Sequence, residues 1–472
     1  MAADAPADFP GTPPAPGPAP RLNVPAPVAQ ILPNGLEVVS VRRADLPLVT
    51  AQLVLRSGGE MDPPDEAGLA DLTANLLSKG AGGKSAPQIA AAAEALGGSL
   101  QAAAGWDESA VGITVTTPRL PAALDLLATV VRHPDFAPDE LKRAQAQAVD
   151  DLRLMLSQPI ALASLAAGRA VFGDGAYGHS RTGTPASIAR ISRADVERLH
   201  AVLYRPDNAI LVLAGDITPA QAGQLAQASF GDWRKPATPL PAKPGSRADS
   251  ALPALLLIDQ RGAGQAGVVA AHAAPPRRDA GYYTGVVANA VLGGSYSARL
   301  NEEIRIKRGL SYGASSRLQP MADAGLWLAA AQTKNPSAPQ VVVLMQQQFA
   351  ALGDDRVPAA ELAARKATLI GAYGRSLETT AGLAQQVAEL AVYGLPLTDI
   401  GQYIASVQAV TPKQIEAYAR KNLDAKHTRI VVVGDAAQFA PALRKAYPKA
   451  GLLEAGQLDL DSPSLQPAAA GH

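Results

Sequence analysis

The side chains that most often bind zinc are scarce in this sequence, which has no cysteine and only six histidines. No two of the histidines are four residues apart, so no helix can present two imidazoles to one metal ion. No G-x-S-x-G segment provides an activated serine beside any of them. A self-contained hydrolase site is therefore not expected, and each histidine is interpreted as a surface or packing residue. The six are His133, His179, His200, His272, His427 and His472.

Two glycine-rich segments match parts of nucleotide-binding motifs, but their context does not fit. Gly262-Ala-Gly-Gln-Ala-Gly267 is followed by the β-type run Val268–Pro276, whereas the dinucleotide fingerprint needs a helix at that point. Gly82-Gly-Lys-Ser85 ends like a phosphate loop, yet the first glycine of that motif would fall at Ser78. We therefore expect a turn between strands at the first segment, a helix-ending loop at the second, and no nucleotide cofactor.

Size and composition indicate a globular protein with more than one domain. The 472 residues exceed what one hydrophobic core usually supports. Lysine plus arginine (42) equals aspartate plus glutamate (42), and no basic cluster alternates with aromatic residues, so nucleic acid is not an expected partner. The longest apolar runs, such as Ala251–Ile258, are too short to cross a bilayer.

The start of the chain is rich in proline and alanine, and residues 1–20 are predicted to be disordered. The absence of cysteine excludes disulfides and thiolate zinc sites, but it is compatible with both the cytoplasm and the periplasm. A methionine followed by such a stretch is typical of a mature exported protein whose signal peptide has been replaced. We expect a periplasmic location, with the cytoplasm as the alternative.

A second proline-rich stretch, residues 236–245, is predicted to be a linker, because prolines disfavour both helices and central strands. The flanks repeat one plan of strands and helices, and each closes on a strand that ends in Gly-Asp, at Asp216 and Asp435. We therefore expect an α+β fold with two homologous domains, at residues 21–235 and 246–450. Each domain is predicted to be a mostly antiparallel sheet with helices packed on one face, and residues 451–472 to form a tail.

The helical segment Gly68–Leu77 and the residues after it, to Ala81, resemble a motif of the M16 peptidases, the family of insulinase and pitrilysin. Active members carry H-x-x-E-H in this helix, where two histidines bind zinc and the glutamate activates a water. This sequence has Asp71, Ala74 and Asn75 at those positions. The distal glutamate ligand corresponds to Asp151. Because alanine cannot take a proton from water, the resemblance implies an inactive N-terminal half that holds no metal.

Residues 259–312 resemble the C-terminal domain of the same family more completely. They contain a Gly-Gly turn followed by S-x-R-L, then E-I-R ending at Arg305, then R-G-L-S-Y ending at Tyr312. In the family, an arginine and a tyrosine with this spacing point into the active site formed by the zinc-bearing half. The resemblance implies that Tyr312 donates a hydrogen bond to the developing oxyanion and that Arg305 holds a substrate carbonyl.

Together the two motifs imply the non-catalytic subunit of a heterodimeric zinc metallopeptidase, inactive when alone. The implied partner is a related chain that carries H-x-x-E-H, the distal glutamate and the zinc ion. In this family two such chains close like a clam around a chamber in which unfolded peptides are cut. An extended peptide is expected to pair with a sheet edge, which favours loose sequence selectivity.

Three other hypotheses stay open. A scaffolding M16 homologue, like the inactive core subunits of respiratory complexes, would make Arg305 and Tyr312 dispensable. A peptide-binding homodimer would need no partner with H-x-x-E-H. An enzyme with a divergent metal site at Asp71, Asn75 and Asp151 would lack its general base, because alanine occupies that position.

Overall fold

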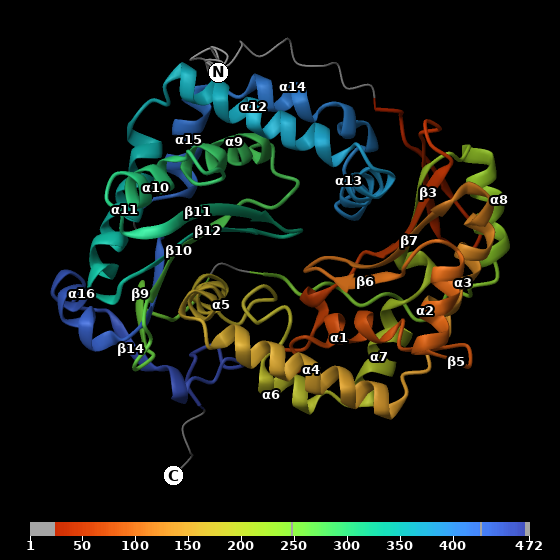
Figure 1. Cartoon of the computed structure of the whole chain (residues 1–472), viewed down its shortest axis with the longest axis horizontal. Helices are drawn as coiled ribbons and strands as arrows, with labels where there is room; N and C mark the ends of the chain where they lie inside the picture. The colour runs from red at the N-terminus through yellow and green to blue at the C-terminus, as the bar shows by residue number, and fades with distance from the viewer. Residues whose placement is uncertain (1–23, 247–248, 425–426, 468–472) are drawn as a thin grey trace, which may run out of the picture.

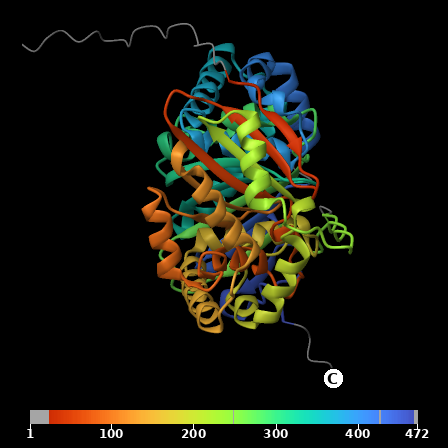
Figure 2. The ribbon, with the colours of Figure 1, turned by 90° about the vertical axis from the view of Figure 1, so that its right-hand side faces the viewer.

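The computed structural model describes residues 24–246, 249–424 and 427–467. Within them the chain forms two six-stranded sheets, one from each half of the sequence, and a small two-stranded hairpin. Figure 1 shows the N-terminal half on the right and the C-terminal half on the left. Figure 2 shows the N-terminal half in front of the other. The stretch predicted to be disordered, residues 1–20, lies outside the described residues.

The N-terminal sheet has the strand order β1-β2-β8-β3-β7-β6, in which only β2 and β8 are parallel. Its strands are β1 Val28–Ile31, β2 Glu37–Arg42, β3 Leu48–Leu55, β6 Gln101–Ala104, β7 Ser109–Thr116 and β8 Ala209–Gly215. The hairpin pairs β4 Gly80–Ala81 with β5 Lys84–Ser85. The helices of this half are α1 Leu69–Leu76, α2 Ala86–Ala95, α3 Leu120–Arg132, α4 Pro138–Leu156, α5 Pro159–Phe172, α6 Pro185–Arg190, α7 Arg193–Leu203 and α8 Pro219–Phe230.

The C-terminal sheet has the order β11-β12-β10-β13-β9-β14 and is antiparallel except around β9. Its strands are β9 Leu255–Asp259, β10 Ala266–Ala274, β11 Ser311–Pro320, β12 Gly325–Thr333, β13 Arg429–Gly434 and β14 Gly451–Glu454. Its helices are α9 Tyr282–Leu292, α10 Arg299–Asn301, the π-helical turn η4 Glu302–Ile306, α11 Ala338–Asp354, α12 Ala359–Ser376, α13 Thr380–Val392, α14 Tyr403–Ala409, α15 Pro412–Asn422 and α16 Ala440–Ala446. The glycine-rich segment before β10 is a turn between strands, as predicted.

One face of each sheet packs on helices from its own half, which confirms the predicted α+β class. In the N-terminal half, Val111 of β7 shares a buried cluster with Leu72 of α1 and Leu127 of α3. In the C-terminal half, Trp327 of β12 shares one with Val291 of α9. Each fully buried side chain of this size contributes about 1.5–3 kcal/mol relative to an exposed one.

The opposite face of each sheet is covered by a helix from the other half of the sequence. Helix α5 packs on β10 and β13, where Phe172 and Val431 belong to one buried cluster. Helix α13 packs on β8 and β3, where Val387 and Val212 belong to another. The two halves therefore hold one another through a reciprocal pair of helices, which the periodicity of the sequence does not predict.

A sharp bend between α4 and α5 makes this exchange possible. The chain breaks at Ser157 and Gln158, and Pro159 opens α5 at a position where its missing N–H is tolerated. The two helices meet at 100°. In the described part of the chain, no single helix is long and apolar enough to span a bilayer. The bent pair α4–α5 taken together meets the criteria of length and composition, and of these alone.

The segment from residue 451 to 467, predicted to be a tail, adds to the C-terminal half. Strand β14 pairs with β9, and Leu465 is fully buried in the cluster around α5. Arg169 of α5, 2% exposed, donates hydrogen bonds to the carbonyl oxygens of Leu460 and Asp461, both at 3.3 Å. Leu453, Leu458, Leu460 and Leu465 of this stretch therefore pack in the core of the chain itself, whereas Leu452 is exposed.

A buried carboxylate joins the two halves at the turn between β6 and β7. Asp107, 2% exposed, accepts hydrogen bonds from the hydroxyls of Tyr177 at 2.6 Å and Tyr393 at 3.2 Å. It also accepts one from the backbone N–H of Ala322 at 3.0 Å. Tyr393 and Ala322 belong to the C-terminal half, so the Asp107 side chain forms two hydrogen bonds between the halves. Burial raises the pKa of Asp107, and the hydrogen bonds oppose that rise.

The helix exchange predicts that damage to α5 destabilises the C-terminal sheet. Phe172→Ala empties a fully buried site, which should lower the free energy of unfolding by about 3–5 kcal/mol. Hydrogen exchange should accelerate in β10 and β13. Leu154→Ala, at a 69% exposed position on α4, is the control and should change stability by less than about 0.5 kcal/mol. Loss of protection confined to the N-terminal half would contradict the prediction.

A second prediction concerns Glu60, which lies beside Asp107 and is 1% exposed. Burial raises its pKa from 4.5 to about 7, although Lys243, with Nζ 2.8 Å from Oε1, opposes the rise. Because the pKa is higher in the folded state, the contribution of Glu60 to stability falls as pH rises from about 4.5 to 7.

Glu60→Gln removes this titration. The variant should be more stable than the wild type above pH 7 by on the order of 3 kcal/mol, and the advantage should vanish below about pH 4.5. Urea unfolding at several pH values measures the difference. Glu94→Gln, at an exposed position on α2, is the matched control and should show no such pH dependence. A constant difference at every pH would refute the role of Glu60.

Candidate functional site

Helix α1 carries the three positions that correspond to H-x-x-E-H, and its start is fixed by Asp62. Gly68 precedes the helix with φ +92°, a conformation that favours glycine, and a Cβ there would lie 2.8 Å from the backbone nitrogen of Gly183. The Asp62 carboxylate accepts hydrogen bonds from the backbone N–H groups of Gly68 and Ala70, both at 2.9 Å. Burial raises the pKa of Asp62, and these hydrogen bonds oppose the rise. The position of the first turn of α1 is therefore fixed by Asp62 and by the close approach of Gly68 to Gly183.

The side chains on this helix do not reproduce the chemistry of the motif. Ala74, at the general-base position, is fully buried in the core of the N-terminal half. Asp71 Oδ1 accepts a hydrogen bond from Arg181 Nη1 at 3.1 Å, and Arg181 also donates to the carbonyl of Ala104. Asn75, one turn further, offers only an amide. The carboxylate that would face a metal is thus paired with a guanidinium.

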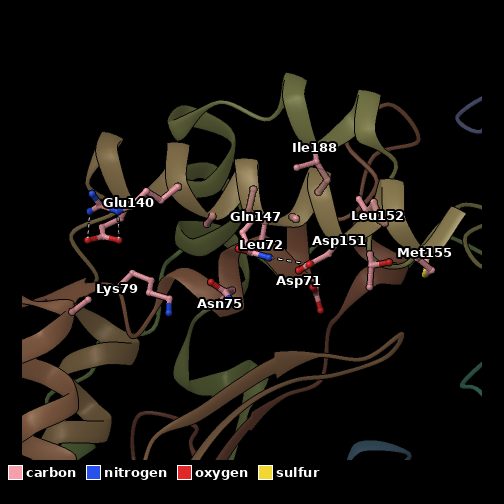
Figure 3. A pocket seen from close by; sticks show the side chains of 15 residues that line it. Asp71, Leu72, Asn75, Lys79, Glu140, Gln147, Asp151, Leu152, Met155 and Ile188 are labelled. Carbon is pink, nitrogen blue, oxygen red and sulfur yellow. Dashed lines mark hydrogen bonds and ion pairs between the residues drawn. The ribbon is translucent and has the colours of Figure 1, made fainter. Parts of the chain in front are cut away.

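Asp71 and Asn75 line a pocket of about 630 Å³ between α1 and α4 (Figure 3). Asp151 lies on its α4 wall, where its Oδ1 accepts a hydrogen bond from Gln147 Nε2 at 2.9 Å. Glu140 forms an ion pair with Arg143. Asp71, Asn75 and Asp151 line one pocket, but each of the carboxylates in it already accepts a hydrogen bond or forms an ion pair within the protein.

The pocket does not fit a catalytic zinc ion. It offers carboxylates that are hydrogen-bonded to protein donors, the amides of Asn75 and Gln147, and no imidazole, whereas catalytic zinc sites are built mainly from histidine, with carboxylate or cysteine as further ligands. In residues 24–246, 249–424 and 427–467, no group of three or more histidines and acidic residues could hold a metal ion.

Arg305 and Tyr312 lie on two neighbouring elements with irregular backbones. Arg305 belongs to the π-helical turn η4, and π turns occur frequently at functional sites. Gly309, with φ +62°, reverses the chain, and the turn closes with a hydrogen bond from its N–H to the Arg305 carbonyl at 2.9 Å. The turn η4 packs on β11, so the structure holds the segments of Arg305 and Tyr312 together.

Tyr312 projects from a β-bulge near the start of β11. The register with β12 shifts between Ser311 and Ala314, so Tyr312 and Gly313 have no partner residues on β12. The Gly313 N–H instead donates to Ser311 Oγ at 3.1 Å. Bulges re-aim side chains and occur often beside active sites. Tyr312 is 90% exposed, the largest exposed fraction among the big apolar and aromatic side chains described.

Several residues of this region are not predicted by sequence reasoning. Arg181, which neutralises Asp71, lies 110 residues away along the chain and no motif marks it. Tyr296 lies in the loop between α9 and α10, and the centroid of its ring lies 4.7 Å from Cζ of Arg305. The only signal for Tyr296 is an aromatic residue between two serines in a loop that otherwise favours small side chains.

Three histidines serve packing, as the sequence analysis expects. His272 is buried beside Thr428, with Nε2 3.0 Å from the hydroxyl oxygen, and burial lowers its pKa to about 4. His200 Nε2 lies 2.7 Å from the carbonyl oxygen of Val131. Burial also lowers the pKa of His200 and of His179. None of the three faces the pocket between α1 and α4.

Comparison with known proteins supports the family resemblance. Residues 37–171 match the model described as insulinase (peptidase family M16), and residues 190–369 match the model described as peptidase M16 inactive domain. The uncharacterized zinc protease Rv2782c of Mycobacterium tuberculosis is 26% identical over 343 residues, 72% of this chain and 77% of that protein. The uncharacterized zinc protease SCO5738 of Streptomyces coelicolor is 23% identical over 342 residues, 72% of this chain and 74% of that protein.

Solved structures share the fold. A peptidase M16 inactive domain from Pseudomonas fluorescens has a TM-score of 0.81 at 27% identity and covers 86% of this chain and 98% of its own. A protease from Helicobacter pylori, at 18% identity, has a TM-score of 0.80 and covers 87% of this chain and 100% of its own. The latter shows the fold alone. With both halves matched by family models, the chain belongs to the M16 peptidase family.

Proposed function

We propose that this chain is the non-catalytic subunit of a heterodimeric zinc metallopeptidase and that it supplies Arg305 and Tyr312 to the active site of its partner. The partner would be a related chain with an intact H-x-x-E-H helix and the zinc ion. The substrates would be unfolded peptides, held in the chamber between the two chains. A scaffold without a role in catalysis is the competing function.

One observation carries this proposal: the two halves of the chain differ in how they present their motif residues. In the N-terminal half, the base position is a buried alanine and Asp71 is paired with Arg181. In the C-terminal half, Arg305 is partly exposed on a π turn and Tyr312 is 90% exposed on a β-bulge, and neither has lost its motif residue type. A chain that served only as scaffold would have no need of these irregular elements.

The chemistry of the pair suits peptide hydrolysis in a shared site. Zinc bound by the partner would supply an activated water for attack on the scissile carbonyl. The Tyr312 hydroxyl can donate a hydrogen bond to the oxygen that becomes negatively charged in that step. The Arg305 guanidinium can hold a neighbouring substrate carbonyl with two parallel N–H donors.

The sheets also offer places for an extended substrate. Strands β6 and β11 are edge strands, with neighbours on one side only in the described part of the chain. A peptide that pairs with the free edge of β11 would run past Tyr312. Such pairing uses main-chain hydrogen bonds, so affinity would depend little on substrate sequence.

The shared site predicts a collapse of activity when either residue of the pair is changed. Casein hydrolysis is measured with the zinc-bearing partner mixed with this chain as wild type, Arg305→Ala or Tyr312→Phe. Loss of a donor to the oxyanion should lower kcat by about 10²- to 10³-fold for Tyr312→Phe. Arg305→Ala should lower kcat/KM as well. The matched control is Arg444→Ala, at an exposed position on α16, which should leave the rate unchanged. Full activity of both pair variants would identify the chain as a scaffold.

The degenerate pocket gives a complementary prediction. This chain alone should not hydrolyse casein with zinc present, because a buried alanine, Ala74, occupies the general-base position of the motif. Asp71→Ala and Asp151→Ala, tested in the mixture, should leave the rate unchanged if zinc is bound only by the partner. Chelator-sensitive hydrolysis by this chain alone would support the divergent metal site instead.

A further inference from the structure

The loop from Gly293 to Ser297 lies directly beside Arg305 and is held by buried side chains. It connects α9 to α10, and its carbonyl at Gly293 accepts a hydrogen bond from the N–H of Ser316 on β11 at 3.0 Å. A Cβ at Gly293 would lie 2.3 Å from that nitrogen, so only glycine allows this approach. The loop is therefore pressed against the strand that carries Tyr312.

Arg365 of α12 forms hydrogen bonds with the loop residues on both sides of Tyr296. Its Nη1 donates to the hydroxyls of Ser295 at 3.0 Å and Ser297 at 2.7 Å, and its Nη2 donates to the Ser297 carbonyl. Arg365 is only 8% exposed. The bonds to Ser295 and Ser297 fix the backbone on either side of Tyr296 and leave its ring projecting outwards.

The charge of Arg365 has no carboxylate partner in the described part of the chain. Glu361, one turn earlier on α12, instead forms a bidentate pair with Arg299 at 2.9 and 3.0 Å. The Nε of Arg365 is buried without a hydrogen-bond partner among the described residues. Buried charges are normally paired, and an unpaired buried donor is costly. The buried Arg365 therefore costs stability, and its hydrogen bonds instead fix the position of the loop that carries Tyr296.

Asn301 ties the same loop to the segment of Tyr312. Asn301 is 3% exposed, its Nδ2 donates to the Tyr296 carbonyl at 2.5 Å, and its Oδ1 accepts from the Ala314 N–H at 3.1 Å. Ala314 is the residue at which β11 rejoins β12 after the bulge. One buried amide therefore sets the loop and the bulge relative to each other.

The result of these contacts is an exposed ring placed over a guanidinium. Tyr296 is 65% exposed, and its ring centroid lies 4.7 Å from Cζ of Arg305. The Tyr296 side chain has no hydrogen bond among the described contacts. An aromatic side chain that is neither buried nor hydrogen-bonded contributes little to the core, whereas a guanidinium stacked on a ring loses rotational freedom.

We propose that Tyr296 is the positioning residue for Arg305 and that Arg365 places Tyr296. The stacked ring would keep the Arg305 guanidinium in one orientation, ready for a substrate carbonyl. The catalytic part of this inference rests on the proposed function of Arg305, but the stacking itself does not.

The first test observes the stack in this chain alone. In protein labelled with ¹⁵N-arginine, the Arg305 side-chain Nε–Hε signal is assigned by its loss in Arg305→Ala. Tyr296→Leu should shift this signal, because the ring no longer lies over it, while Tyr296→Phe should keep the wild-type position. Arg365→Met should shift it in the same way as Tyr296→Leu. Leu46→Ala, which shortens a 61% exposed side chain between β2 and β3, is the control and should not move it.

The second test uses casein hydrolysis by the mixture with the zinc-bearing partner. Tyr296→Leu should lower kcat/KM by about 2- to 5-fold, the size expected for an exposed cation–π contact, and Tyr296→Phe should restore it. Should Arg365→Met fail to fold, Tyr296→Leu still decides, since it leaves every buried hydrogen bond of the loop in place.

The outcomes separate the two ideas. An Arg305 signal that stays in place in Tyr296→Leu overturns the positioning role, whatever the activity. A signal that shifts as expected, together with full activity of Arg305→Ala, keeps the stack and overturns the proposed catalytic contribution. A shifted signal and equal losses in Tyr296→Leu and Tyr296→Phe would assign the hydroxyl, not the ring, and would also overturn the inference.

Discussion

The reciprocal packing of α5 and α13 is the constraint on which the rest of this fold depends. Each sheet has one apolar face for its own helices and a second that is covered mainly by a helix from the other half. With α13 removed, Val39, Val41 and Val212 would form part of a broad apolar surface open to water, and such surfaces are rare on stable monomeric proteins. The halves are therefore parts of one cooperative structure, even though each repeats the same plan.

This exchange also fixes the walls of the degenerate pocket. Helix α4 provides one wall and continues through a 100° bend into α5, which is anchored on the C-terminal sheet. Helix α1 provides the other wall, and Asp62 holds its first turn. Neither anchor uses the residues that would bind zinc. The chain can therefore have alanine, asparagine and a guanidinium-paired aspartate at those positions and still keep the M16 fold.

Much of this fold can be predicted from the sequence, because regular elements follow local rules. The plan of strands and helices that the two halves repeat follows from apolar periodicity, and the turn before β10 follows from its glycines. The exchange of α5 and α13 cannot be predicted in this way, because apolar residues show that a helix is buried without showing against which sheet. The same limit hides β14, whose alternating leucines fit a tail, a partner surface or an edge strand equally well.

The candidate site shows the same division between local and distant information. The spacing of Arg305 and Tyr312 is local, so the motif identifies both. The bulge that exposes Tyr312, the pairing of Asp71 with Arg181 and the hold of Arg365 on the loop depend on residues distant in sequence. These distant contacts have opposite effects in the two halves. In the N-terminal half they pair the Asp71 carboxylate with a guanidinium, whereas in the C-terminal half they maintain an irregular backbone on which Tyr312 is 90% exposed and Arg305 is partly exposed. The π turn, the β-bulge and the buried Arg365, which has no carboxylate partner among the described residues, are departures from regular packing that local sequence patterns do not reveal.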